Sequence, residues 1–106
     1  GRFQPFHDGH KQIFLEGLKS SNQVCILVMD SQGIDNKNPF NFKYVEKKIH
    51  QALKKYKNQY IIIKIPVIKE LIYGRKVGYK IKKIKLSKKI EKISATKIRK
   101  EMFINE

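Results

Sequence analysis

The sequence predicts a single α/β domain in which a parallel sheet is covered by helices on both faces. Strand-length apolar runs alternate along the chain with segments of helical periodicity. One strand candidate, Gln23–Met29, is also almost continuously apolar, which is typical of parallel strands buried on both sides. A length of 106 residues is enough for one domain with a small core.

The first half of the chain contains two predicted helices and one predicted strand. Residues 1–10 have the composition of a loop. Such loops follow buried strands in α/β proteins, so we expect a first strand before them. That strand is missing from this sequence or truncated in it. A helix is expected over Asp8–Ser20, with Asp8 as its N-cap. The apolar run Gln23–Met29 predicts a strand. After a polar loop, apolar residues at helical spacing predict a helix over Phe42–Tyr56.

The second half is expected to add two strands and a helix. The β-branched run Tyr60–Ile68 predicts a strand, and two glycines predict a turn over Ile72–Gly78. Apolar residues mixed with lysines predict a half-exposed strand over Tyr79–Leu86. Hydroxyl side chains at the start of Ser94–Phe103 are typical of a helix N-terminus. Ligands of such folds bind where strands end and helices begin, so the loops before the first and last helices are the expected site.

Composition indicates a globular protein without a membrane span. Hydrophobic residues make up 41% and charged residues 31%, and no apolar run approaches the length that crosses a bilayer. The polar N-terminal stretch does not have the pattern of a signal peptide. Cys25 is the single cysteine, and its place in an apolar run predicts a buried side chain in a reducing compartment. We therefore expect a cytoplasmic protein.

The net charge of +15, from 24 basic and 9 acidic residues, is typical of nucleic-acid binding. Lysine, isoleucine and asparagine are all abundant, however, and an AT-rich coding sequence would produce that mixture whatever the function. Arginine is more selective, because its planar fork of donors binds phosphate in a way that lysine cannot copy. The three arginines are Arg2, Arg75 and Arg99, and each lies in a segment suited to binding phosphate.

The first motif is GRFQPFHDGH, in which His7 and His10 flank Gly9 where a helix is expected to begin. Helix N-termini carry free N–H groups that favour phosphate, and imidazoles there can donate to phosphate oxygens. Gly9 has no side chain, so a nucleotide can pack against the backbone. A metal pair is the alternative, but only Asp8 stands nearby as a third ligand, and no metal site is expected.

The second motif is ISATKIR, residues 93–99. Ser94 and Thr96 lie where a helix is expected to start, and Arg99 follows Thr96 by about one turn. Such a set can hold the distal phosphates of a triphosphate. Alone, the segment also fits an ordinary capped helix with a solvated arginine. Its occurrence together with the first motif favours the phosphate site.

The two motifs resemble the signatures of the HxGH nucleotidyltransferase superfamily. HDGH, preceded by GRFQPF, resembles the HxGH signature, and ISATKIR resembles the ISxTxxR segment. GRFQPFH, and the NPF at Asn38–Phe40, are closest to the archaeal-type nicotinamide-mononucleotide adenylyltransferase branch. The resemblance spans nearly the whole chain. It implies one Rossmann-like, doubly wound, cytidylyltransferase-like domain over residues 1–106 that is incomplete at its N-terminus.

The resemblance also implies the reaction and its residues. A nucleoside monophosphate, with AMP from ATP favoured over CMP from CTP, would pass to a phosphate-bearing acceptor such as nicotinamide mononucleotide, and pyrophosphate would leave. His7, His10 and Arg99 would be catalytic, and Mg²⁺ would arrive with the triphosphate. The expected nucleotide contacts are Arg2, Phe3, Gln4, Gly9, Ser94, Ala95, Thr96 and Arg99, with Lys11 and Arg75 as further phosphate contacts.

Other functions stay open from the sequence. A basic nucleic-acid-binding domain explains the charge, and tyrosines among lysines could stack on bases, but this leaves the two motifs unexplained, so a nucleic-acid partner is not expected. An inactive fragment lacking the first strand is a third reading. The residues between Val67 and Tyr73 are too few for the extra helix that many relatives carry. The sequence therefore does not assign the residues of the acceptor pocket. The superfamily often assembles, so a homo-oligomer is one option.

Overall fold

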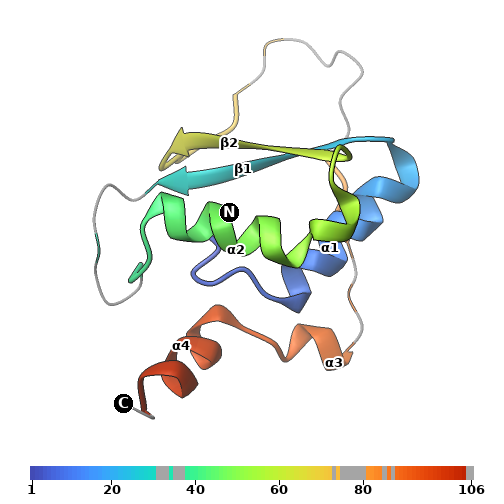
Figure 1. Cartoon of the computed structure of the whole chain (residues 1–106). Coiled ribbons are helices and arrows are strands. Elements are labelled where there is room, and N and C mark those ends of the chain that lie inside the picture. The colour runs from blue at the N-terminus through green and yellow to red at the C-terminus, as the bar shows by residue number, and fades with distance from the viewer. Residues whose placement is uncertain are drawn as a thin grey trace.

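The fold is taken from a computed structural model, which describes residues 1–30, 34, 38–72, 74, 81–84, 86 and 88–104. Figure 1 shows an α/β arrangement in which helices pack against a parallel pair of strands. This confirms the predicted α/β class with a Rossmann-like parallel sheet. The elements in chain order are α1 Asp8–Ser20, β1 Val24–Asp30, α2 Phe42–Ala52, the short 3₁₀ helix η1 Lys54–Tyr56, β2 Tyr60–Pro66, α3 Lys88–Glu91 and α4 Ala95–Ile104.

The two strands pair in parallel from Val24 opposite Tyr60 to Asp30 opposite Pro66. Successive side chains of a strand point to opposite faces, so only alternate residues meet the helices. In Figure 1, α1 and α2 both lie on the same side of the pair. On the other face, Leu27 and Ile61 are exposed, and the described residues do not provide the two-sided cover that the sequence predicted.

Cys25 corrects a second expectation. The prediction placed its thiol in the core, whereas the structure leaves it exposed. The physical reason is the strand period of two: Ile26 points into the core, so its neighbour Cys25 points to the open face.

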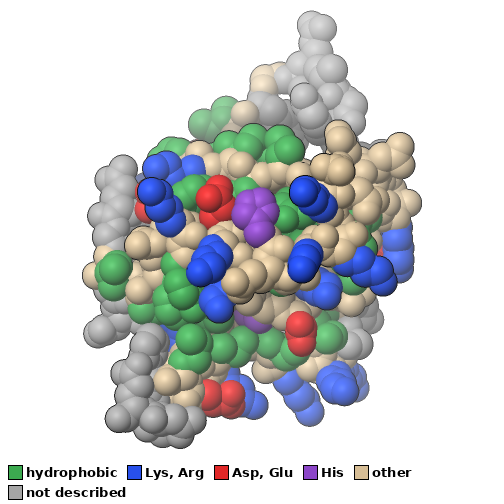
Figure 2. Space-filling model, in the orientation of Figure 1, with side chains coloured by type: hydrophobic (Ala, Val, Ile, Leu, Met, Phe, Trp, Pro, Cys, Tyr) green, Lys and Arg blue, Asp and Glu red, His purple; other side chains and the backbone are tan. Residues whose placement is uncertain are grey.

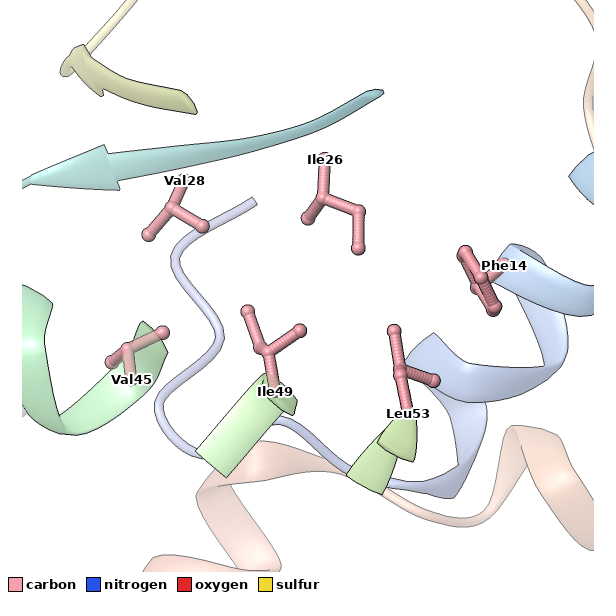
Figure 3. Close-up of a cluster of buried hydrophobic side chains, with 6 residues drawn as sticks. All are labelled: Phe14, Ile26, Val28, Val45, Ile49 and Leu53. Carbon is pink, nitrogen blue, oxygen red and sulfur yellow. The ribbon is translucent and has the colours of Figure 1, made fainter. Parts of the chain in front are cut away.

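The core forms where α1, β1 and α2 meet (Figure 3). Val45, Ile49 and Leu53 recur at four-residue intervals, which places them on one face of α2 and its C-cap. Phe14 comes from α1, and its ring meets Tyr60 of β2 edge-on at 5.8 Å between ring centroids. The buried apolar side chains are Phe14, Ile26, Val28, Val45, Ile49 and Leu53.

Gly1 occupies a strand-like position beside β1. Its amine donates to the Leu27 carbonyl at 2.8 Å, and the Met29 N–H donates to the Gly1 carbonyl at 2.9 Å. These two bonds are the pattern of a parallel pair centred on Val28. β2 pairs with β1 along its other edge. Gly1 therefore lies in parallel register with Val28, beside the edge of β1 that β2 does not occupy.

Several element bounds differ from the prediction. The helix expected over Phe42–Tyr56 ends at Ala52, because its last turn tightens into η1. The strand expected to reach Ile68 ends at Pro66, a residue without a backbone N–H to donate.

The strand expected over Tyr79–Leu86 is wrong for residues 81–84, which carry no strand. An extended segment needs a neighbouring backbone to pair with, and the described residues give this one none. Residues 79, 80 and 85 of that prediction lie outside the described residues, as does most of the turn expected over Ile72–Gly78. In the part of the chain that is described, no helix is long and apolar enough to cross a membrane.

Candidate active site

The start of α1 is capped by the two histidines of the first motif. His7 is the N-cap, with an extended backbone at φ −136° and ψ 179°. Its Nδ1 accepts the Gly9 N–H at 3.0 Å, and His10 Nδ1 accepts the His7 N–H at 3.1 Å. Serine or threonine and a glutamate usually make this reciprocal capping box. The prediction of Asp8 as N-cap is therefore wrong, because Asp8 is already the first helical residue.

This capping fixes the tautomer of both rings. A neutral imidazole carries one proton, and a nitrogen that accepts a backbone N–H cannot hold it. Both Nδ1 atoms accept, so Nε2 is the N–H donor of His7 and of His10. The rings are stacked, with centroids 3.7 Å apart and planes 23° from parallel. The helix start thus presents two hydrogen-bond donors side by side.

Both imidazoles are neutral at neutral pH. Burial lowers the pKa of His10 to about 4, with further lowering from the nearby His7 and the amino terminus. Burial also lowers the pKa of His7, against the opposite effect of the Asp8 carboxylate. Phe3 and Phe6 provide part of the cover over His10, with ring centroids 4.8 Å and 5.5 Å from its own. The pair is therefore a set of neutral donors rather than a pair of cations.

Gly9 is required by the packing of the histidine pair. A Cβ at this position would lie 2.8 Å from Cε1 and 3.0 Å from Nδ1 of His7. Carbon atoms do not approach that closely, so any other residue would push the His7 ring from its capping position. The sequence predicted a nucleotide contact for Gly9; the structure adds this contact within the cap.

Arg99 brings the second motif to the first. Its guanidinium donates through Nη1 to the carbonyl oxygen of Gln4, 95 residues away in the chain. Nη2 donates to Thr96 Oγ1 at 3.3 Å. Ser94 caps α4, because its Oγ accepts the Lys97 N–H at 3.1 Å. Figure 1 shows α4 below the N-terminal loop, on the side away from the sheet. Arg99 of α4 thus lies against the loop that carries the histidines.

Two hollows adjoin these motifs. A groove of about 780 Å³ begins at Phe3 and His10 and continues along the apolar side chains of α1 and β1. Of the three predicted catalytic residues, His10 alone lines this groove. A smaller hollow of about 270 Å³ has Ser94 in its lining together with Lys89, Lys92 and Lys97. The sequence could not single out these lysines, because lysine is common throughout the chain.

Comparison with known proteins now adds to this geometry. The family model of cytidylyltransferase-like proteins matches residues 1–61, which span the histidine motif, both strands' starts and the core helices. The chain belongs to the cytidylyltransferase-like family. It is similar to a protein of Methanococcus aeolicus named nicotinamide-nucleotide adenylyltransferase, with 29% identity over 134 residues, covering 100% of this chain and 76% of that protein. No solved structure matches the chain.

The remaining predicted site residues of this cytidylyltransferase-like chain differ in how exposed they are and in what they contact. Arg2 is exposed, and Lys11, in the first turn of α1, is half-buried. The Phe3 ring packs against His10, and its backbone has a φ of 53°, in the left-handed region that side chains rarely adopt. Ala95 is the first residue of α4. Arg75 lies outside the described residues.

Gln4 differs most from its prediction. The sequence predicts it as a nucleotide contact, whereas the structure buries it and bonds its amide to the backbone of Phe40. Among the described residues, no three His, Cys, Asp or Glu side chains gather into a metal site.

Proposed function

We propose that this chain transfers AMP from ATP to a phosphate-bearing acceptor such as nicotinamide mononucleotide and releases pyrophosphate. Membership of the cytidylyltransferase-like family and the name of the Methanococcus relative support a nucleotidyltransferase. The GRFQPFH opening and that name favour adenylyl transfer. The observation that carries the proposal is the pair of fixed Nε2–H donors at the start of α1, with Arg99 held against the same loop.

The chemistry is an in-line displacement. An oxygen of the acceptor's phosphate attacks the α-phosphorus of ATP, and the bond to the β-phosphate oxygen breaks as pyrophosphate leaves. The attacking oxygen is already anionic, so the step needs no side-chain nucleophile and no strong base. Catalysis then comes from positioning and from stabilisation of the charge that spreads over the phosphoryl oxygens.

Each group of residues has its own task in this scheme. His7 and His10 donate their Nε2–H groups to the non-bridging oxygens of the α-phosphoryl group. Thr96, Ser94 and Arg99 hold the β- and γ-phosphates that leave together. Mg²⁺ enters as part of the substrate, bound to the triphosphate, because this ion keeps its waters and prefers substrate phosphates to dedicated protein cages. We also propose a cytoplasmic location and leave the homo-oligomer as one option.

A second candidate is nucleic-acid binding, which the net charge of +15 favours. Figure 2 shows lysine and arginine side chains scattered over the visible face among other groups rather than gathered into one stripe. A nucleic-acid backbone is tracked best by a continuous basic surface. The scatter on this face therefore favours the enzyme over the nucleic-acid binder.

Pyrophosphate release tests the proposal. The chain is incubated with MgATP or MgCTP and a panel of phosphate acceptors, nicotinamide mononucleotide first. We expect release with ATP and an acceptor, and less with CTP. Release of pyrophosphate with CTP but not with ATP would mean that the chain uses CTP. A salt-dependent gel shift with nucleic acid, and no pyrophosphate release from either nucleotide, would support the nucleic-acid binder instead.

His10→Ala is the variant that connects the activity to the site. Loss of one donor to a developing oxyanion typically costs about 10²- to 10³-fold in turnover. Loss of the capping acceptor is worth only about 1 kcal/mol of stability, so the variant is expected to fold. Circular dichroism and pyrophosphate release check the two effects separately. Wild-type turnover in His10→Ala would remove the proposed role of the imidazoles.

A further inference from the structure

Gln4 is a buried amide whose two polar atoms both pair with the backbone of Phe40, and its Nε2 also donates to the Arg2 carbonyl at 3.5 Å. Its exposed fraction is 6%. Oε1 accepts the Phe40 N–H at 2.9 Å, and Nε2 donates to the Phe40 carbonyl at 3.0 Å. The side chain thus acts as a neighbouring strand residue would, giving one acceptor and one donor to the backbone of the same residue. The two residues are 36 positions apart.

The backbone of Gln4 makes a third connection. Its carbonyl oxygen accepts the Arg99 guanidinium. One residue therefore joins the loop of the histidines, the segment that leads into α2, and α4. These are the two signature segments and the residues of the NPF stretch.

The Phe40 end of this pairing is itself fixed. The Phe40 ring stacks on Tyr44, with centroids 4.4 Å apart and planes 15° from parallel. Asn41, the next residue, caps α2 by accepting the Tyr44 N–H through Oδ1 at 2.9 Å. Because α2 and its C-cap carry half of the buried core side chains, the Gln4 amide is anchored to a segment that leads directly into the core.

Glutamine suits this position for a physical reason. A buried peptide N–H and carbonyl each cost free energy when left without a partner, and one amide side chain satisfies both. With Oε1 and Nε2 engaged on Phe40, the amide has little capacity left for a nucleotide. Its effect on a ligand must then pass through the groups that it holds.

We propose that Gln4 is a positioning residue that holds Arg99 in reach of the polyphosphate. The amide fixes Gln4 against Phe40, and the fixed carbonyl oxygen of Gln4 orients the Arg99 guanidinium. The inference rests on the proposed function only for its expected effect on kcat/KM. Its structural part concerns the Gln4–Phe40 and Gln4–Arg99 bonds, which can be measured without turnover.

The test compares Gln4→Met with Gln51→Met. The first removes both bonds to Phe40 with little change of volume, and the second makes the same change at an exposed position of α2. We expect Gln4→Met to lower kcat/KM for ATP about 10- to 100-fold, as misplacement of a phosphate-binding group does. The Phe40 amide should exchange with solvent about tenfold faster or more, since its acceptor is gone. Gln51→Met should change neither.

A double-mutant cycle separates positioning from general support of the fold. If Gln4 acts through Arg99, then Arg99→Ala costs less in the Gln4→Met background than in the wild type. Independent losses that multiply would overturn the proposal, as would kcat/KM within twofold of wild type in Gln4→Met.

Two provisions keep the test decisive. If Gln4→Met does not fold, Gln4→Glu takes its place, because it keeps an acceptor for the Phe40 N–H but offers no donor to the Phe40 carbonyl. If the wild type releases no pyrophosphate, the proposed function fails. The Phe40 exchange rate in Gln4→Met, or the guanidinium NMR signals of Arg99 in whichever Gln4 variant folds, then decides the positioning claim alone. Unchanged signals would overturn it.

Discussion

At the scale of single residues, backbone groups decide what the two imidazoles can do. Each Nδ1 accepts a backbone N–H of the cap, so each ring presents an Nε2–H. A preorganised neutral donor stabilises charge that develops on a phosphoryl oxygen without a proton transfer. Because the pKa of His10 is held near 4, this donor state persists through the neutral range.

The lowered pKa of His10 predicts how stability depends on pH. The unfolded chain takes up this proton near pH 6.5, and the folded chain only near pH 4. Between these values the unfolded chain holds more protons, so the stabilisation is complete above pH 6.5 and is lost as the pH falls towards 4. Urea unfolding of the wild type and of His10→Gln at several pH values measures this. We expect the free energy of unfolding to fall, over this pH range, by about 1–2 kcal/mol more in the wild type than in the variant.

An equal loss of unfolding free energy in the wild type and in His10→Gln would contradict the assignment of the lowered pKa to His10. His7 is present in both, so the lowering of its own pKa cancels in the comparison.

Gly9→Ala tests the packing of the cap. The added methyl group would lie 2.8 Å from His7 Cε1, so the imidazole must move or the helix start must shift. Overpacking of this kind costs about 1–3 kcal/mol. We expect a lower Tm and at least a tenfold loss of pyrophosphate release. Gly74→Ala is the matched control, because a Cβ there meets no atom within 4 Å. Equal behaviour of the two variants would contradict the steric argument.

At the scale of elements, periodicity predicted the part of the fold that surrounds the core. The helix over Asp8–Ser20 is confirmed to the residue, and the strands begin within one residue of their predicted starts. These elements carry strong local patterns, and their packing agrees with those patterns. The strand predicted over Tyr79–Leu86 is wrong for residues 81–84, because strand formation depends on a pairing partner, which a local pattern does not contain.

From the sequence, candidate site residues could be predicted, but most of their contacts could not. The motifs pointed to the histidines and to Arg99, and the structure brings Arg99 to the loop of the histidines. The capping box was not foreseen, because histidine is an uncommon cap. The pairing of Gln4 with Phe40 joins residues far apart in sequence, and no spacing rule reaches that distance.

Ile49→Ala tests the core that fixes α2. Ile49 is fully buried among side chains from α1 and β1. Removing three carbons from such a site costs about 2–5 kcal/mol, because lost burial adds to the cavity left behind. Lys47→Ala, at an exposed position of the same helix, should change stability by no more than about 0.5 kcal/mol. Chemical unfolding measures both, and similar values would mean that α2 is not packed as described.

At the scale of the whole molecule, the fold joins the two ends of the chain around one loop. Arg99 and Gln4 are separated by 95 positions, yet they share a hydrogen bond. The fixed imidazoles lie on one side of that loop, in the cap of α1, and the hydroxyls of Ser94 and Thr96 lie at the start of α4. The central claim is that both groups bind the same polyphosphate.

An NMR titration with MgATP, without an acceptor, tests this claim most directly. The signals followed are the Nε2–H groups of His7 and His10 and the guanidinium of Arg99. If all three bind one triphosphate, their signals shift together and saturate with a single midpoint. Histidine signals that shift to saturation while the Arg99 signals stay in place, or the reverse, would contradict the claim.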